Sequence, residues 1–195
     1  MINFILKKSK IVKLRFYIKR TESSTIFRHI EVGIGKINLS FLYICSMKKQ
    51  NLAQLNIARM LSEDINDPLM ADFVAQLDEV NAIAENSEGF VWRLKDEENN
   101  ATSFRPFDDN RVIVNLSVWE NIEALKNFAY TGRHVEVFRN RRAWFEKSIE
   151  AMVVLWHIDE GHTPSVQEAK ERLEYLREHG ATDFAFDFKY LKEKI

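Results

Sequence analysis

The chain has 195 residues, of which 46% are hydrophobic and 29% are charged, and its formal net charge is −1. This composition indicates a globular chain of one domain, with or without a tail. No stretch approaches the roughly 20 consecutive apolar residues that a membrane-spanning helix needs, so we expect a cytoplasmic protein without a membrane partner. The 149 residues from Met47 onward contain no cysteine, which excludes a disulfide framework, a thiolate metal site and a cysteine nucleophile in that part.

The charge is distributed unevenly along the chain. Residues 1–46 carry nine Lys and Arg against two Glu, whereas the rest carries 19 Lys and Arg against 27 Asp and Glu, so the two parts have net charges of +7 and −8. A secretory signal is disfavoured, because Lys and Arg interrupt the apolar residues of the first part throughout. A basic arm for nucleic acid or an anionic membrane is an alternative. We favour a non-native or disordered N-terminal extension over residues 1–46, followed by one domain over residues 47–195 with no nucleic-acid partner.

Residues 51–58 alternate and predict the first strand of the domain, with Gln54 and Asn56 on one face and aliphatic side chains on the other. Asp67 and Pro68 then provide the cap and the first-turn proline of a helix, whose apolar residues recur at helical spacing up to Gly89. Residues 90–95 predict a short second strand, and residues 96–110 a long polar connection.

A third strand is predicted over residues 112–119, and Asn121 caps the helix that follows. Thr131 and Gly132 interrupt this helix, and a helical stripe then resumes as far as Phe145. Residues 151–158 predict a fourth strand. The order β-α-β-β-α-β predicts an α+β fold, a ferredoxin-like antiparallel sheet with both helices on one face.

Two further elements are expected after this unit. A capping box from Ser165 to Glu168 begins an extra helix, which ends near Gly180. Phe184, Phe186 and Phe188 alternate with Ala185 and Asp187 and predict a final strand.

One face of the predicted sheet carries short neutral polar groups and apolar groups where a solvated face would carry charges. Its side chains are Gln54, Asn56, Ile113, Asn115, Ser117 and Trp119. Such a face suits enclosure, because amides and hydroxyls can be hydrogen-bonded when they are desolvated. We expect a second copy of the sheet to cover it, giving a homodimer whose two sheets form a barrel that holds a small-molecule ligand.

Several separated stretches resemble a bacterial family described only as a domain of unknown function. They are AQLNIARM (53–60), FVWRL (90–94), NLSVWENIEAL (115–125), RRAWFEK (141–147) and VLWHIDEGHTPSVQEAKERLEYL (154–176). The family is placed in the dimeric α/β-barrel superfamily, near the antibiotic-biosynthesis monooxygenases, and the resemblance covers residues 51–188 but not residues 1–46. Haem-degrading members of this superfamily use an amide on the first strand, a Trp at the end of the third and a His on the second helix, so the resemblance assigns these places to Asn56, Trp119 and His134.

The candidate site residues follow from strand parity and from this resemblance. Asn56, Asn115 and Ser117 are expected to bind a ligand, or else to hydrogen-bond one another across a closed barrel. Trp119 could stack on a planar ligand or pack in the core or the dimer interface. Arg93 could bind an anionic group or form a salt bridge. His134 could act as a general base or lie on a helix surface.

No metal site is expected. His157, Asp159, Glu160 and His162 cluster in the sequence, but a turn separates them and their spacing matches no standard ligand pattern. A Ser/His/Asp triad, a phosphate-binding loop and a dinucleotide-binding motif are missing as well.

We therefore expect a protein that binds a small molecule and leans towards a cofactor-independent monooxygenase-like enzyme acting on a planar, mostly apolar substrate. The alternatives are a non-catalytic ligand-binding or haem-binding protein, and a filled barrel that acts through its dimer surface. A cavity large enough for a ligand, with a His or an Arg directed to it, would favour the enzyme.

Overall fold

The computed structural model describes residues 18–21, 24–27, 49–130 and 132–193. The chain divides into two compact units, Met1–Met47 and Lys48–Ile195. In the first unit, strands β1 (Ile18–Thr21) and β2 (Ser24–Phe27) pair antiparallel. The other residues of that unit lie outside the described residues, so the proposed N-terminal extension over residues 1–46 stays a prediction.

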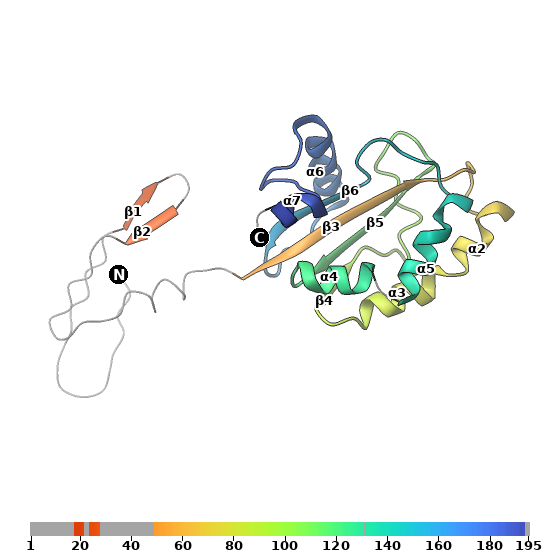
Figure 1. Ribbon diagram of the computed structural model, residues 1–195, viewed down its shortest axis with the longest axis horizontal. Coiled ribbons are helices and arrows are strands. Elements are labelled where there is room, and N and C mark those ends of the chain that lie inside the picture. Colours follow the sequence, from red (N-terminus) through yellow and green to blue (C-terminus); the bar gives the residue numbers. More distant parts are fainter. Residues whose placement is uncertain (1–17, 22–23, 28–48, 131, 194–195) are drawn as a thin grey trace. The chain divides into compact units, whose positions relative to one another are not determined.

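The second unit is built on a four-stranded antiparallel sheet (Figure 1). Its strands are β3 (Gln50–Arg59), β4 (Phe90–Arg93), β5 (Val112–Trp119) and β6 (Val153–Asp159). They lie in the order β4-β5-β3-β6, so the first and third strands of the domain are central. With the helices that follow β3 and β5, this order is the ferredoxin-like β-α-β-β-α-β topology. The predicted α+β fold is confirmed.

Helices cover both faces of this sheet (Figure 1). On one face lie α2 (Ala71–Val74), α3 (Leu77–Glu85), α4 (Ile122–Ala129) and α5 (Gly132–Asn140), with the 3-10 turns η1 (Pro68–Met70) and η2 (Arg141–Ala143) at their ends. On the other face lies α6 (Val166–His179). A last helix, α7 (Phe188–Glu193), follows the segment that pairs with the edge of β6.

The predicted helix caps are confirmed, but the first helix is shorter than expected. The Asp67 side chain accepts a hydrogen bond from the Leu69 amide at 2.8 Å, and Pro68 opens the helical segment. The segment is not continuous up to Gly89: it breaks between α2 and α3, and α3 ends at Glu85.

The prediction that helical structure continues through Phe145 is wrong. Helix α5 ends at Asn140 and η2 ends at Ala143. Phe145 pairs with Met60 as an isolated β-bridge, and Trp144 is buried against Met60 and Met70. The two aromatic residues therefore pack against the end of β3 and not within a helix. Their spacing alone does not distinguish this arrangement from a continued helix.

The predicted final strand over residues 184–188 is wrong as well. Only Phe186 pairs with the sheet, through an isolated bridge to Leu155. The Asp187 side chain accepts hydrogen bonds from the amides of Lys189 and Tyr190, both at 2.9 Å, and so begins α7. Alternating phenylalanines resembled a strand, but an Asp that caps a helix ends the extended backbone after one bridge.

The most consequential correction concerns the face of the sheet that carries Gln54, Asn56, Ile113, Asn115, Ser117 and Trp119. We call it the semi-polar face. We expected the domain's helices on the aliphatic face and a second copy of the sheet on the semi-polar one. Instead, α6 packs on the aliphatic side chains, with Ala169 and Leu173 in the same cluster as Leu55 and Val114. The semi-polar face meets α3 and α4 of the same chain, where Trp119 packs among the helical side chains. A partner sheet is not needed to cover this face, and the homodimer stays a prediction.

The turn into β4 provides a test of this helix packing. Gly89 has a φ of 77°, and a Cβ atom added there would lie 2.6 Å from the Cβ of Ala124 on α4. Gly161 also has a positive φ, 87°, but an added Cβ would meet nothing within 4 Å. We expect Gly89→Ala to lower the free energy of unfolding by about 2–4 kcal/mol and Gly161→Ala by about 1–2 kcal/mol, because only the first adds an overlap to the backbone strain. Urea unfolding measures both, and equal losses would contradict the placement of α4.

Candidate functional site

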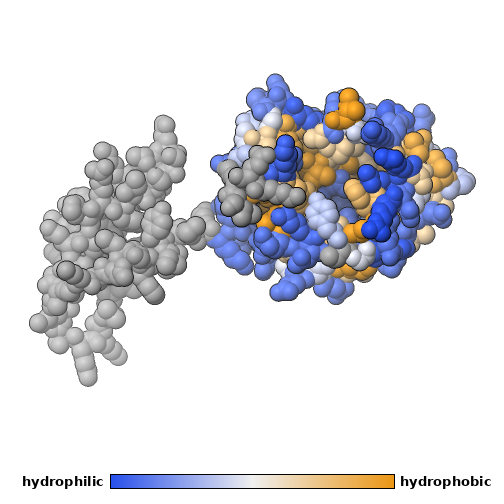
Figure 2. Space-filling view, viewed as in Figure 1, coloured by the Kyte–Doolittle hydropathy of each residue, from blue (hydrophilic) through white to orange (hydrophobic). Residues whose placement is uncertain are grey.

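A cavity of about 490 Å³ lies between the semi-polar face and the helices α2, α3 and α5, a volume in the range of small-molecule sites. The sheet contributes Asn56, Ala58, Ile113 and Asn115, and the helices contribute Phe73, Leu77, Val80, His134 and Val137. Figure 2 shows hydrophobic side chains gathered among hydrophilic ones on the face of this unit that is in view. The lining therefore combines apolar side chains with polar and charged ones in similar numbers, which suits a ligand with an apolar body and polar groups.

Two amides line the cavity from the sheet. Asn56 on β3 is directly opposite Asn115 on β5, and Asn115 is exposed although its neighbours Val114 and Leu116 are buried. Neither amide side chain hydrogen-bonds with any described residue. Each amide therefore offers two donors and one acceptor to a molecule in the cavity.

The next polar pair along the same two strands, Gln54 and Ser117, is hydrogen-bonded within the fold. The Ser117 hydroxyl donates to Gln54 Oε1 at 2.9 Å, and Trp119 Nε1–H donates to Ser117 Oγ at 3.0 Å. The Trp119 ring stacks on Phe128 with centroids 5.2 Å apart and meets Phe90 edge-on at 5.3 Å. Ser117 and Trp119 are buried and do not line the cavity, so the structure places two of the predicted ligand-binding residues in the layer beside it.

His134 lines the cavity from α5. Its Nδ1 lies 2.9 Å from the carbonyl oxygen of Ala129, and a carbonyl only accepts, so Nδ1 carries the proton. Its ring packs on Phe128 with centroids 4.8 Å apart. Burial lowers the pKa of His134, and the hydrogen bond to Ala129 opposes this only in part. The imidazole is therefore neutral at pH 7, and its unprotonated Nε2 can accept a proton.

Arg93 also lines the cavity, from β4, and is only 7% exposed. Its Nε donates to a carboxylate oxygen of Glu85 at 2.9 Å, and its Nη2 donates to Asn99 Oδ1 at 2.8 Å. The salt bridge that we considered as the alternative fate of Arg93 is therefore present. A buried guanidinium needs such a partner, and its role in ligand binding stays a prediction.

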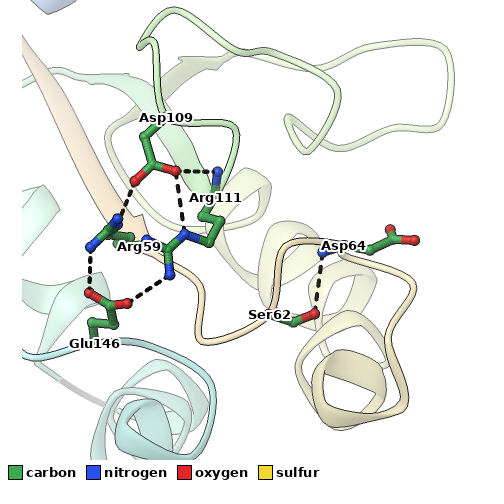
Figure 3. Close-up of polar contacts among 6 residues, drawn as sticks. All are labelled: Arg59, Ser62, Asp64, Asp109, Arg111 and Glu146. Atoms are coloured by element: carbon green, nitrogen blue, oxygen red, sulfur yellow. Dashed lines mark hydrogen bonds and ion pairs between the residues drawn. The ribbon is translucent and has the colours of Figure 1, made fainter.

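A charged cluster that sequence analysis missed includes Glu146 of the cavity lining (Figure 3). Arg59 at the end of β3 donates to Asp109 and, at 2.9 Å, to Glu146. Arg111 donates to the other oxygen of Glu146 at 3.0 Å and lies 3.5 Å from Asp109. Nearby, the Asp64 amide donates to Ser62 Oγ at 3.2 Å. The cluster joins three segments that are far apart in the sequence, and no local pattern indicates it.

The acidic and histidine residues after β6 form no metal site in the described part of the chain. Glu160 lies 3.3 Å from the Lys49 ammonium group, and His162 Nε2 lies 2.8 Å from Glu168. Among the described residues, no three His, Cys, Asp or Glu side chains are grouped so that they could hold a metal ion. None of the described helices is long and apolar enough to cross a membrane.

Comparison with known families decides the classification of the chain. A family model described as "Domain of unknown function (DUF3291)" matches residues 51–194. The chain belongs to the DUF3291 family. The match leaves out residues 1–50 and includes the cavity and all helices on both faces of the sheet in this DUF3291 domain. A search of curated proteins finds no match.

Solved structures similar to this DUF3291 chain include three from named bacteria. PA3566 from Pseudomonas aeruginosa is 11% identical, with a TM-score of 0.39, over 60% of this chain and 100% of its own. SnoaB from Streptomyces nogalater, described as a cofactor-independent oxygenase, is 13% identical, with a TM-score of 0.38, over 59% of this chain and 96% of its own. A conserved protein of Bacteroides thetaiotaomicron, described as a possible oxidoreductase, is 12% identical, with a TM-score of 0.37, over 58% and 99%.

Stability measurements distinguish Asn115, whose side chain has no hydrogen bond to a described residue, from Ser117, which is hydrogen-bonded to Gln54 and Trp119. Ser117→Ala leaves Trp119 Nε1–H and Gln54 Oε1 without their partner, so we expect it to lower the free energy of unfolding by about 1–3 kcal/mol. Asn115→Leu removes no hydrogen bond within the described residues and should change that free energy by no more than about 0.5 kcal/mol. Urea unfolding monitored by tryptophan fluorescence checks both variants. A larger loss for Asn115→Leu than for Ser117→Ala would show that the amide supports the fold.

The lowered pKa of His134 predicts a dependence of stability on pH. The folded protein binds this proton more weakly than the unfolded chain, whose His has a pKa of about 6.5. Stability is therefore complete above that value and falls as the pH decreases below it towards the folded pKa. Between pH 7.5 and 5.5, the wild type should lose more free energy of unfolding than His134→Asn, whose Nδ2 amide group replaces Nδ1–H as a donor for Ala129. A folded-state NMR titration of His134 with a pKa at or above 6.5 would contradict this account.

Proposed function

We propose that this DUF3291 domain binds a planar, mostly apolar small molecule in the cavity and oxygenates it without a cofactor. The observation that carries the proposal is that one cavity contains a neutral histidine and two amides without a hydrogen bond to any described residue. Pre-positioned donors and an unprotonated base are the two components that proton abstraction next to a carbonyl requires. The resemblance to the antibiotic-biosynthesis monooxygenases supports the same class of chemistry, as an analogy.

The reaction needs no reductant. His134 Nε2 takes a proton from an activated methylene group of the substrate, and the amides of Asn56 and Asn115 stabilise the enolate oxygen that results. The carbanion form then adds dioxygen and loses water, so that the methylene group becomes a carbonyl group. One oxygen atom enters the product and the other leaves as water, and dioxygen accepts all four electrons.

A non-catalytic binding protein that uses the same cavity is the second candidate, and the placement of His134 favours the enzyme over it. Binding alone needs no neutral imidazole with a free Nε2 at the cavity wall. Haem binding fits less well. Of the three residues that the resemblance assigns to haem degradation, Asn56 and His134 line the cavity but Trp119 does not, so we derive no step through haem.

Binding can be measured with N-phenyl-1-naphthylamine, a neutral aromatic probe that fluoresces in apolar sites. We expect saturable 1:1 binding by the wild type. Asn115→Trp places an indole ring in the cavity and should abolish it, whereas Val91→Trp adds the same ring at an exposed position of β4 and should not. Binding that survives Asn115→Trp would show that the probe does not occupy this cavity.

Catalysis can be measured with anthrone, a planar ketone whose methylene group is acidic and whose oxygenation yields anthraquinone and water. We expect the protein to accelerate oxygen uptake over the spontaneous rate, and His134→Gln to lower this acceleration by roughly 10²-fold or more while it leaves probe binding intact. Acceleration that is unchanged in His134→Gln would exclude the histidine as the base. Probe binding without any acceleration would favour the non-catalytic alternative.

A further inference from the structure

The lining of the cavity is positively charged within an acidic domain. From Met47 onward the chain carries a net charge of −8. The cavity lining nevertheless includes four cations, Arg93, Arg141, Arg142 and Lys147, and a single carboxylate, Glu146. A local excess of one sign against the charge of the whole domain points to a ligand of the opposite sign.

Three of these five charged groups already have partners. Arg93 is paired with Glu85. Arg141 donates to the carbonyl oxygen of Phe138 at 2.9 Å, and its guanidinium lies 4.0 Å from the centre of the Phe138 ring. Both oxygens of Glu146 are taken by arginines outside the lining. The carboxylate therefore does not neutralise its neighbours in the cavity.

Arg142 and Lys147 are different, because neither forms an ion pair or a hydrogen bond with any described residue. Both are exposed and line the cavity, so they stand at its mouth. Their backbone is fixed between them: the Trp144 carbonyl accepts from the Leu61 amide at 2.8 Å, and the Glu146 amide donates to the Arg59 carbonyl at 2.9 Å. Two cations without an ion-pair partner among the described residues are thus held at the entrance by a segment anchored to the end of β3.

We infer that the ligand of this cavity is an amphiphilic organic anion, whose planar apolar body fills the cavity and whose carboxylate or sulfonate binds Arg142 and Lys147 at the mouth. This inference rests on the proposed function and narrows its substrate class. The apolar side chains of α2, α3 and α5 contact the body, and the amides of Asn56 and Asn115 hold a neutral oxygen at the centre. Arg142 supplies a forked donor that matches an oxyanion, and Lys147 supplies a second charge.

A pair of probes that differ only in charge tests the inference. 8-Anilinonaphthalene-1-sulfonate is N-phenyl-1-naphthylamine with an added sulfonate group. At low ionic strength we expect the full-length protein to bind the sulfonate about tenfold more tightly than the neutral probe. This preference should decrease as salt is added, because exposed charges are screened.

The variants make the assignment specific. In Arg142→Gln/Lys147→Gln the preference for the sulfonate should fall about tenfold, while binding of the neutral probe stays unchanged. The control, Lys126→Gln/Arg139→Gln, removes the same charge from two cations that do not line the cavity and should keep the preference.

Each outcome bears on the inference. Equal affinity of the wild type for the two probes, or the same loss in both double variants, would overturn it while the proposed function stands. Failure of the neutral probe to bind at all would overturn the proposed function, and the inference with it.

Discussion

The site depends on the register of β3 against β5. That pairing places Asn56 opposite Asn115 and, two residues further along, Gln54 opposite Ser117. Because side chains alternate between the faces of a strand, a slip of one residue would turn the two polar groups of the slipped strand to the face that α6 covers and would bury them among aliphatic side chains. Burial without partners costs several kcal/mol for such groups, so the polar pattern itself disfavours the slipped register.

The two polar pairs then have different fates because their surroundings differ. Gln54 and Ser117 lie beside the aromatic cluster of Trp119 and Phe128, which excludes water, and they are satisfied by each other and by the indole. Asn56 and Asn115 lie where the helices stand away from the sheet, and the cluster of Arg59, Asp109, Arg111 and Glu146 fixes the segments at that end. The hydrogen-bonded pair of Gln54 and Ser117 thus supports the strands beside the cavity. The pair of Asn56 and Asn115 faces the cavity itself.

Periodicity predicted most of the fold, and strand parity correctly placed Asn56 and Asn115 on one face. These patterns failed where the structure depends on which other element packs against a segment. A semi-polar face indicates enclosure, but nothing in its residues distinguishes a second sheet from helices of the same chain. The C-terminal segment was mispredicted for a related reason. Its three alternating phenylalanines indicated a strand, but Asp187 caps a helix there. Ser117 and Trp119 have the parity of ligand contacts, yet both are buried outside the cavity, and side chains of α3 and α4 pack on Trp119. The cluster around Arg59 could not be foreseen, since its members are distant in sequence.

The central claim is that a ligand lies between the semi-polar face and the helices of the same chain. The most direct test is solution NMR of the full-length protein with N-phenyl-1-naphthylamine, observing side-chain amide and ring resonances. The account predicts that the amides of Asn56 and Asn115 and the imidazole of His134 shift on binding, while the indole of Trp156, on the face that α6 covers, does not. Shifts at Trp156 without shifts at the two amides would place the ligand on the opposite face and contradict the account.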